Sequence, residues 1–432
     1  MPAIAFFCLL LVLLVAATGL AGGLFNVMDF GARADGAKDD ASAFQAAIDA
    51  ASAAGGGVVL APAGTYLLAG SVIVMPNITL RGEYSWPGGL AGTVLNVTYG
   101  QGDEMLPAAL QLVGGGNAIE NLAMNWPDQD PQQAEPLKYP YAIKVGPSSR
   151  VENVFLRNPY KGLDMDAAHM NLARNISGEP LRIGIHSDHT YDTSRIENIH
   201  FWPYFTNGKL MRDFVQNHGV AFEIGRSDWQ CLLNTFCYGY HTGYRLYKTD
   251  PVEALGYPGG VTNGQFVGIG ADRCVYGLDI EDSFALGLSI THGMFAPFGA
   301  GEGSRAVLLR SGNTGNLTLT NCDFWAVPDT LIEVQSGSLN MTACNIHEWG
   351  VLHKSDDRPC FIASGGRLNI NGCTFNQQGA LARLTGEATQ ALIMGNMGIG
   401  PLSVENGIGA RAVFGPNNPA LTVSELPAEQ GG

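Results

Sequence analysis

Two segments in the middle of the chain concentrate side chains that could carry out acid–base chemistry. Residues 185–204 read IHSDHTYDTSRIENIHFWPY, and residues 222–247 read FEIGRSDWQCLLNTFCYGYHTGYRLY. Carboxylates, imidazoles and guanidinium groups at this density can transfer protons and neutralise an anionic ligand. The candidate catalytic residues are Glu223, Asp188, Asp228, His189 and Arg226.

The carboxylates match the needs of glycoside hydrolysis. That reaction uses one protonated carboxyl group for the leaving oxygen and one carboxylate that activates water or attacks the sugar. Glu223 lies on a predicted strand and is the strongest candidate, with Asp188 or Asp228 on adjacent loops as its partner. Arg226 or His189 could hold the ionised carboxylate in its charged form. The sequence leaves open which group is the acid and which is the base.

Two other functions stay open beside hydrolysis. β-Elimination on a uronic-acid polymer needs a base near the C5 proton and a cation or hydrogen bonds for the sugar carboxylate. The groups available for it are Arg226, Arg245, Tyr238 and His241. No cofactor is expected and no metal ligand is assigned, although a lyase could hold Ca²⁺ through Asp188, Asp192 and Asp228. The third alternative is a non-catalytic glycan-binding spike or adhesin, which the histidine-rich central segments disfavour.

Repeats in the second half of the chain indicate how these residues are positioned. Residues 316–325 read NLTLTNCDFW, residues 338–347 read SLNMTACNIH, and residues 367–376 read RLNINGCTFN. A repeat of about 20 to 30 residues is typical of a solenoid, in which each coil buries its core against the next. Because polar and apolar residues alternate as in strands, we expect an all-β, single-stranded β-helix. Cys322, Cys344 and Cys373 share one position and are expected to point inward as small apolar fillers.

Residues 39–57 predict a helix ahead of these coils. Asp39 or Asp40 can cap its start, and three consecutive glycines end it. Its apolar face consists of Phe44, Ala47, Ile48 and Ala51. Since a solenoid exposes a hydrophobic end, we expect this segment to be an N-terminal capping helix over the first coil.

Register between coils turns distant residues into columns of neighbours. Alignment of the predicted strands places Trp202, Tyr238, Gly268, Phe295 and Trp325 outward in one column. Outward aromatic rings in a row can serve as platforms on which sugars stack. The predicted substrate-binding residues are Trp202, Tyr238, Trp229, His200, His241, Phe295 and Trp325, and His347-Glu348-Trp349 forms a reserve binding site.

A second column, from another sheet, is mostly acidic. Its outward residues are predicted to be Asp164, Gly184, Glu223, Tyr247, Asp279 and Glu333. Neighbouring coils lie about 4.8 Å apart, so Glu223 and Asp279 should be roughly 9–10 Å apart. That distance is near the upper end of the range for inverting glycosidases, about 6.5–9.5 Å.

The opening of the chain resembles the pectate-lyase-like superfamily, in the branch grouped with rhamnogalacturonases and uronan epimerases. The matching residues are Asp29-Phe30-Gly31-Ala32, Asp35-Gly36, Asp39-Asp40, Ala46-Ala47-Ile48, Gly56-Gly57 and Pro62-x-Gly64-x-Tyr66. The resemblance implies a right-handed parallel β-helix and a carbohydrate substrate. We interpret these aspartates as structural, because capping and turn chemistry explain them. No family catalytic residue is transferred, since the central coils lack a paired Asp-Asp beside Gly-His-Gly.

Composition and the N-terminus limit location and partners. The chain has 432 residues, of which 46% are hydrophobic and 15% charged, and a net charge of −15 that argues against nucleic acid. Residues 1–21 are apolar with small residues near their end, which predicts a signal peptide and a secreted protein, extracellular or periplasmic. A retained membrane anchor is the alternative; after cleavage no membrane contact is expected. Residues 22–432 are predicted as one β-helix domain: about 22–82 the cap and first coils, about 83–400 central coils, and about 401–432 a C-terminal tail. The expected partner is a polysaccharide substrate, and a homotrimer is the form of association considered.

Overall fold

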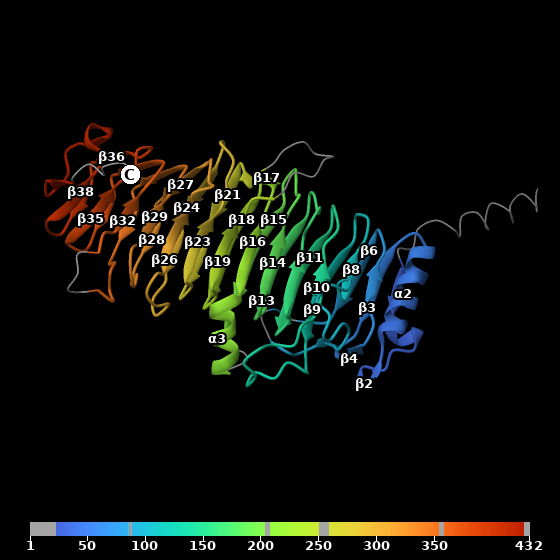
Figure 1. Ribbon diagram of the computed structural model, residues 1–432. Helices are drawn as coiled ribbons and strands as arrows, with labels where there is room; N and C mark the ends of the chain where they lie inside the picture. Colours follow the sequence, from blue (N-terminus) through green and yellow to red (C-terminus); the bar gives the residue numbers. More distant parts are fainter. Residues whose placement is uncertain are drawn as a thin grey trace, which may run out of the picture.

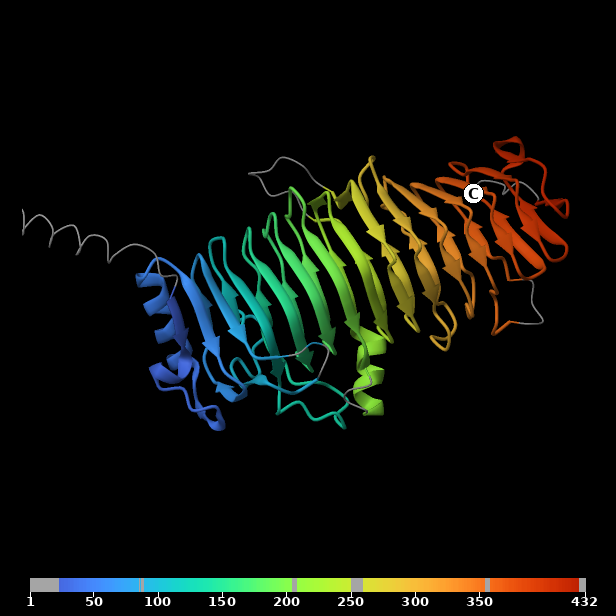
Figure 2. The same cartoon turned by 180° about the vertical axis from the view of Figure 1, so that it is seen from behind.

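The computed structural model describes residues 23–84, 86, 89–203, 208–249, 259–353 and 358–426, and the predicted signal peptide lies outside them. The described chain forms two long sheets with parallel pairing, one of 24 strands and one of 14. Figures 1 and 2 show the coils stacked side by side along one axis. The predicted right-handed parallel β-helix is therefore confirmed.

The 14-stranded sheet takes one strand from each coil, and its spatial order is the chain order. Its strands are β5 (Val72–Val74), β8 (Leu110–Leu112), β10 (Tyr141–Lys144), β12 (Lys161–Asp164), β14 (Ile183–Ser187), β16 (Val220–Ile224), β19 (Thr242–Leu246), β23 (Tyr276–Ile280), β26 (Arg305–Leu309), β29 (Ile332–Val334), β32 (Phe361–Ala363), β35 (Gly379–Leu384), β38 (Leu402–Asn406) and β40 (Thr422–Glu425). Three of the pairing strands, β38, β39 and β40, lie within the range predicted as a C-terminal tail, so coil stacking continues to Glu425.

The 24-stranded sheet forms the remaining walls of the coils. Its strands are β1 (Gly23–Asn26), β2 (Asp35–Asp39), β3 (Gly57–Ala61), β4 (Gly64–Leu68), β6 (Ile78–Gly82), β7 (Thr93–Val97), β9 (Ala118–Asn125), β11 (Arg150–Arg157), β13 (Leu172–Gly178), β15 (Arg195–Phe201), β18 (Cys231–Tyr238), β21 (Gly264–Val267), β22 (Gly270–Asp272), β24 (Leu288–Thr291), β25 (Met294–Ala296), β27 (Asn316–Thr320), β28 (Asp323–Phe324), β30 (Ser338–Thr342), β31 (Asn345–Ile346), β33 (Arg367–Asn371), β34 (Thr374–Phe375), β36 (Gln390–Met394), β37 (Met397–Gly398) and β39 (Ala412–Phe414). A separate two-stranded sheet joins β17 (Ser227–Asp228) to β20 (Val261–Thr262).

Central coils bend within the 24-stranded sheet at a column of asparagines. Asn153, Asn175, Asn198 and Asn234 all have φ between 51 and 56°. Their side-chain amides are linked from coil to coil, for example Asn198 Nδ2 to Asn175 Oδ1 at 2.7 Å and Asn234 Nδ2 to Asn198 Oδ1 at 3.0 Å. Asparagine tolerates the left-handed region better than most residues, and its amide can both donate and accept. In the next coil Gly268, with a φ of +63°, takes this position, and the strand continues beyond it as β22.

Helix α2 (Ala41–Ala53) lies at the N-terminal end of the stack, against β1, β3, β5 and β6 (Figure 1). It buries Phe44, Ala47, Ile48 and Ala51. The aspartates ahead of it have structural contacts, since Asp40 accepts from Arg33 N at 2.8 Å and Asp39 accepts from Ala41 N at 3.1 Å. The other helical segments among the described residues are η1 (Val27–Phe30), α3 (Lys209–His218) and η3 (Gly409–Arg411). None of the helices in the described part of the chain is long and apolar enough to cross a membrane.

The core is a continuous apolar column inside the coils. Cys322, Cys344 and Cys373 lie in it as free thiols, each at most 1% exposed, which confirms that they point inward. Phe295 lies there too, 0% exposed and stacked on Phe324 with ring centroids 5.7 Å apart. The prediction that Phe295 faces outward is therefore wrong. The structure starts β25 at Met294, which turns Phe295 toward the core.

Candidate active site

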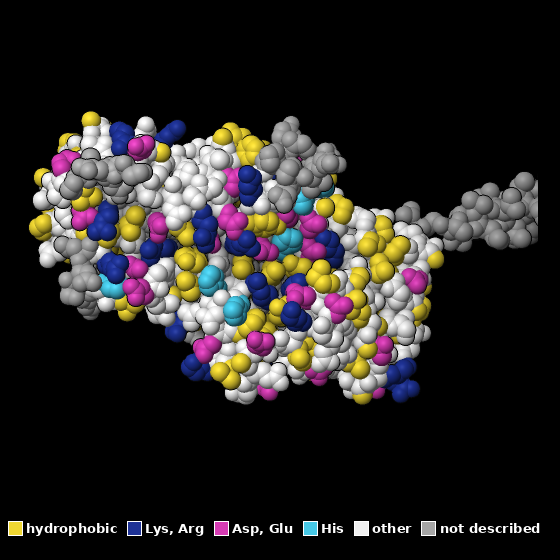
Figure 3. All heavy atoms as spheres, viewed as in Figure 1, with side chains coloured by type: hydrophobic (Ala, Val, Ile, Leu, Met, Phe, Trp, Pro, Cys, Tyr) yellow, Lys and Arg dark blue, Asp and Glu magenta, His cyan; other side chains and the backbone are white. Residues whose placement is uncertain are grey.

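One register position on the 14-stranded sheet carries charged side chains in six consecutive coils. The strand pairings align Lys144 with Asp164, Asp164 with His186, His186 with Glu223, Glu223 with Arg245, and Arg245 with Asp279. Adjacent strands are about 4.8 Å apart, so these side chains are direct neighbours. We call this set the charged ladder. Figure 3 shows acidic, basic and histidine side chains gathered over β14 to β23.

The ladder confirms part of the predicted acidic column and corrects the rest. Asp164, Glu223 and Asp279 lie at the predicted position, and Glu333 follows at the same register beyond Leu308. The prediction was wrong for Gly184 and Tyr247, whose places at this register are taken by His186 and Arg245. Gly184 is buried, and a Cβ there would meet the ring of Phe201 at 2.6 Å. The physical reason is that β14 and β19 direct their polar side chains outward at the residue after the buried Ile185 and Tyr244.

His186 lies at the centre of a hydrogen-bonded chain. Its Nδ1 is 3.2 Å from Asp164 Oδ1, and its Nε2 is 3.0 Å from the Tyr247 hydroxyl. The Tyr247 hydroxyl donates its single proton to Asp188 Oδ2 at 2.6 Å. Tyr247 must therefore accept from Nε2–H, while the Asp164 carboxylate accepts from Nδ1–H. Both ring nitrogens then carry a proton, and His186 is an imidazolium.

Electrostatics favour the same protonation state. Burial lowers the pKa of His186, but the hydrogen bond and the charge of Asp164 outweigh burial and leave the pKa above its ordinary value. Burial raises the pKa of Asp164, but the opposing effects of His186 and Lys144 are larger together, so the pKa lies below its ordinary value. Lys144 Nζ lies 2.9 Å from Asp164 Oδ2. The pair Asp164–His186 is therefore a carboxylate beside an imidazolium.

Two tyrosine rings stack on either side of His186. The centroid of Tyr141 is 6.1 Å from that of His186, and the centroid of Tyr247 is 6.4 Å away. Burial raises the pKa of both phenols well above the ordinary value, and Asp188 adds to the effect on Tyr247. Both tyrosines are consequently neutral at physiological pH and act as hydrogen-bond donors or acceptors.

The other half of the ladder consists of carboxylates held by arginines. Arg245 Nη1 donates to Glu223 Oε1 at 2.8 Å, and Arg245 Nη2 donates to Glu281 at 2.7 Å. Arg310 binds Asp279 with two hydrogen bonds, at 2.6 and 2.8 Å. Charge thus alternates along the ladder from Lys144 to Asp279.

Asp188 joins the hydrogen-bonded chain of His186 and Tyr247, whereas the Asp228 carboxylate and the Arg226 guanidinium contact other groups. Asp188 is 5% exposed and accepts from Arg226 N at 2.7 Å, Thr249 Oγ1 at 2.8 Å and the Tyr247 hydroxyl. These donors occupy the carboxylate, so Asp188 is suited to positioning Tyr247. Asp228 lies on β17 of the two-stranded sheet and accepts from Asn263 at 3.0 Å.

Two further predicted catalytic residues have local partners of their own. The Arg226 guanidinium is packed against the Tyr191 ring at 5.6 Å and the Phe284 ring at 5.3 Å, and the residue is 8% exposed. His189 Nδ1 lies 2.7 Å from Asp166 Oδ1. Neither residue stands at the register of the charged ladder, and their predicted catalytic roles stay predictions.

The predicted sugar-binding aromatics fall into two groups. Trp202 and Tyr238 contact each other with centroids 5.0 Å apart, and His200 packs edge-on to Trp202 at 5.5 Å. Phe298, not Phe295, continues this row, at 6.0 Å from Tyr238 and 5.3 Å from Trp325. Trp229, 50% exposed, lines a different pocket with Asn263 and Leu286. His241 packs against Tyr276 at 5.4 Å, and burial lowers the pKa of its imidazole.

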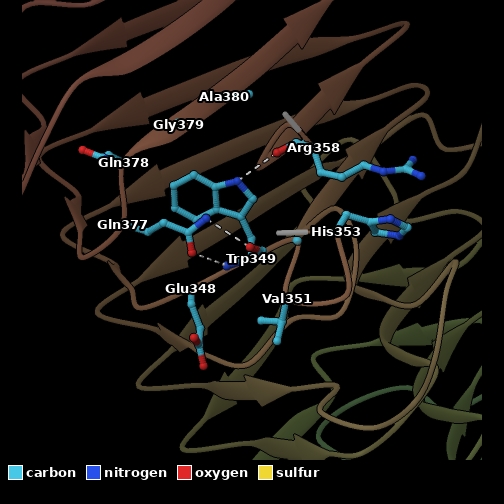
Figure 4. A pocket seen from close by; sticks show the side chains of 10 residues that line it. Glu348, Trp349, Val351, His353, Arg358, Gln377, Gln378, Gly379 and Ala380 are labelled. Carbon is cyan, nitrogen blue, oxygen red and sulfur yellow. Dashed lines mark hydrogen bonds between the residues drawn. The ribbon is translucent and has the colours of Figure 1, made fainter. Parts of the chain in front are cut away.

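The reserve site around Trp349 is a pocket of about 230 Å³ near the C-terminal coils (Figure 4). Trp349 is 2% exposed, and its indole Nε1 donates to Arg358 O at 3.0 Å. Gln377 accepts from Trp349 N at 3.2 Å and donates to Trp349 O at 3.1 Å. The indole therefore supports the pocket from within and offers no open face for a sugar.

Sequence reasoning missed Lys144 and His186 in the charged ladder and Asp272 in the aromatic row. Asp272 pairs with Tyr238, the position where Gly268 was predicted. A signal for the ladder was present as a repeated triplet of a small residue, a large apolar residue and the ladder residue. It recurs as Ala142-Ile143-Lys144, Gly162-Leu163-Asp164, Gly184-Ile185-His186, Ala221-Phe222-Glu223, Gly243-Tyr244-Arg245 and Gly277-Leu278-Asp279.

The described residues contain no cluster of side chains suited to a metal ion. No group of three or more His, Cys, Asp or Glu side chains in this part of the chain is arranged to hold a metal ion. Asp188, Asp192 and Asp228, the residues that could hold Ca²⁺ if the chain were a lyase, do not form such a group among the described residues.

Comparison with known proteins assigns the chain to a family. The model of the family "Rhamnogalacturonase A/epimerase, pectate lyase-like" matches residues 24–250, and the chain belongs to this family. Over 46 residues it is 67% identical to mannuronan C5-epimerase AlgE3 of Azotobacter vinelandii, which covers 11% of this chain and 2% of that protein. Over 98 residues it is 39% identical to alginate lyase 7 of the same organism, which covers 21% of this chain and 11% of that protein. The chain thus spans only a small part of the length of these relatives.

Solved structures resemble the whole coil stack. The A-module of mannuronan C5-epimerase AlgE6 of Azotobacter vinelandii aligns with a TM-score of 0.50 and 17% identity, over 94% of this chain and 100% of that chain. The pre-mature gene product 12 of bacteriophage phi29 aligns with a TM-score of 0.57 and 14% identity, over 93% of this chain and 57% of that chain. At these identities the similarity concerns the fold.

Proposed function

We propose that this chain is a carbohydrate-active enzyme that acts on a polysaccharide of uronic acids and removes the proton at C5 of a uronate residue. The observation that carries the proposal is the imidazolium of His186, held between Asp164 and Tyr247 and adjacent in register to Glu223. Family membership supports a polysaccharide substrate. The names of the two relatives, a mannuronan C5-epimerase and an alginate lyase, support a polyuronate and chemistry at C5.

The ladder offers each group that this reaction needs. Removal of the C5 proton places negative charge on the sugar carboxylate, and Arg245 and Lys144 are cations that can stabilise it. Glu223 is the carboxylate placed to accept the proton. In β-elimination the C5–H electrons form a C4–C5 double bond, the C4–O bond breaks, and the departing oxygen takes the Nε2 proton of His186 in place of the Tyr247 hydroxyl. In epimerisation the C4–O bond stays intact, Glu223 keeps the proton it removed, and His186 delivers a different proton to C5 from the opposite face.

Two residues outside the ladder, Tyr247 and Asp188, position His186. Asp188 accepts from Tyr247, and Tyr247 in turn accepts from His186 Nε2. This chain fixes the ring plane, and a substrate oxygen receives the Nε2 proton by displacing the Tyr247 hydroxyl from it. We assign Tyr247 and Asp188 as positioning residues and Glu223 and His186 as catalytic residues.

Glycoside hydrolysis is supported less well. It requires a protonated carboxyl group, whereas Arg245 pairs with Glu223 and Arg310 with Asp279. Asp188, the predicted partner of Glu223, is filled with donors from Arg226, Thr249 and Tyr247. The proton donor that the ladder provides is an imidazolium.

Product analysis tests the proposal. The full chain is incubated with polymannuronate, polyguluronate and polygalacturonate in D₂O, and products are followed by ultraviolet absorbance, reducing-end assay and NMR. We expect either an absorbing unsaturated uronate or deuterium at C5 without chain cleavage. New reducing ends with neither signal would establish a hydrolase and refute the proposal. Binding without any product would leave the adhesin.

A further inference from the structure

Helix α3 forms one wall of a pocket that the charged ladder does not use. The pocket has a volume of about 330 Å³ and is lined by α3, by Tyr238 and Gly239, and by Arg273 of the next coil. Helix α3 stands beside the strands at one edge of the stack (Figures 1 and 2). It follows β15 and leads directly into β16, the strand of Glu223.

The two faces of α3 have different roles. Met211 and Val215, one turn apart, are each 1% exposed. Lys209, Arg212, Asp213 and Gln216 follow the spacing of a single helix face, and all four line the pocket. The apolar face therefore secures the helix, while the polar face is presented to the cavity.

Several hydrogen bonds fix α3 against the coils. His241 N donates to Val215 O at 3.1 Å, and Arg182 Nη1 donates to His218 O at 2.6 Å. Gln216 Nε2 reaches Arg273 O at 3.4 Å, across the pocket floor. The cavity wall is thus preformed, which lowers the entropy cost of binding a ligand.

Charge in the pocket is positive although the chain carries a net charge of −15. Lys209 is paired with Asp213 within α3. Among the described residues, neither Arg212 nor Arg273 has an acidic partner for its guanidinium group. Both guanidinium groups line the pocket, and arginine binds a carboxylate through paired hydrogen bonds.

An aromatic platform adjoins these cations. Tyr238 lines the pocket and belongs to the row with Trp202 and Phe298. Rings of this kind stack on the apolar face of a sugar, while the arginines can bind its carboxylate.

We propose that this pocket, the α3 pocket, binds a carboxylated sugar residue of the polymer, away from the residue that reacts at the charged ladder. The nature of the ligand rests on the proposed function. The pocket lies at the entrance to β16 and β19, whose outward side chains Glu223 and Arg245 belong to the ladder. A polymer that occupies both places is held at two points, so affinity rises with chain length.

Binding measurements on the full chain test the inference. Oligomers of mannuronate and galacturonate, a neutral cello-oligosaccharide and inorganic phosphate are titrated calorimetrically into the Glu223→Gln variant, which does not consume them. The same background then carries Arg212→Gln with Arg273→Gln, and, as a matched control, Arg195→Gln, an exposed arginine on β15 outside the pocket. We expect the double variant to lose about ten- to a hundredfold in affinity for long uronate oligomers. The control should keep its affinity, and circular dichroism should match for all variants.

Three results would overturn the inference: equal oligomer affinity in the double variant and the control, equal binding of the neutral oligosaccharide, or phosphate binding as tight as that of the uronate oligomer. The proposed function fails separately. If the wild type makes no C5 product but the double variant loses oligomer binding, the α3 pocket stands and the reaction does not. If C5 products form and binding is unchanged, the reverse holds.

Discussion

Asp272 offers a quantitative test of how the aromatic row is built. It pairs with Tyr238 on one side and Ala296 on the other, and the Tyr238–Phe298 ring contact spans its coil. Its Oδ1 is buried and has no hydrogen-bond partner among the described residues. Burial raises the pKa of this carboxyl group from 3.8 to about 6. Replacement by Asn removes the charge and keeps the shape.

The size of the effect follows from that shift. One pKa unit corresponds to about 1.4 kcal/mol, so the shift from 3.8 to about 6 amounts to about 3 kcal/mol at full burial. The carboxyl group is only partly buried, and solvent screening reduces the figure to about 1–2 kcal/mol. The folded pKa exceeds the unfolded one, so the folded state binds the extra proton between them. Stability of the wild type therefore falls as the pH rises from about 4 to about 6.

Urea unfolding of the wild type, Asp272→Asn and Asp272→Ala at about pH 4 and about pH 7.5 measures this difference. We expect Asp272→Asn to gain about 1–2 kcal/mol over the wild type at the higher pH relative to the lower pH. Asp272→Ala should show the same pH-dependent gain, whatever its offset from lost packing. A wild type whose stability relative to both variants is equal at the two pH values, or greater at the higher one, would refute the reasoning. The ionised carboxylate would then have favourable partners.

The remaining predictions concern the charged ladder. Glu223→Gln should lower turnover at least about a hundredfold, because the base is lost, while Glu333→Gln, at the same register beyond the ladder, should retain activity in the same assay. Activity should decline as the pH rises through the elevated pKa of His186. The variant Asp164→Asn should shift this alkaline decline of kcat to lower pH, because Asp164 raises the pKa of His186. A decline at the same pH in the variant would contradict the assignment of His186 as the acid. Tyr247→Phe removes the hydroxyl that donates to the buried Asp188 at 2.6 Å. It should lower the free energy of unfolding by about 1–3 kcal/mol and also lower kcat. Unchanged stability would show that other hydrogen-bond donors to Asp188 are sufficient.

The fold could be predicted because its signals are local and repeated. Alternation around Cys322, Cys344 and Cys373 gives the strands and the inward direction within a single coil. Apolar residues at positions 44, 47, 48 and 51 give the helix α2 from its own periodicity. Neither inference needs to know how one coil is aligned with the next.

The site depends on that alignment, and small irregularities changed it. The strand that begins after Asn263 bends at Gly268 and continues to Asp272, a bend that sequence alternation does not reveal. The predicted strand from Asn263 to Gly268 put Gly268 where the structure has Asp272. The predicted strand from Ser289 to Phe295 ran without a break, whereas the structure divides it into β24 and β25, and this division turns Phe295 inward. In a strand, a shift of one residue exchanges the two faces.

Regular register explains why the catalytic groups that we propose belong to the 14-stranded sheet. The ladder strands from β10 to β23 pair there without a register shift, so insertions such as α3 lengthen a turn without moving the register of Glu223 against His186. A side chain at that register has neighbours about 4.8 Å away on both sides. Each charged side chain of the ladder is then next to side chains of opposite charge, which balance it at the surface of the sheet. In the proposed reaction, the carboxylate of the substrate competes with Glu223 for Arg245 or with Asp164 for Lys144, so that each cation gives up one ion pair. Under that proposal, a preformed row of paired charges binds an anionic polymer and places a base and an acid at one sugar.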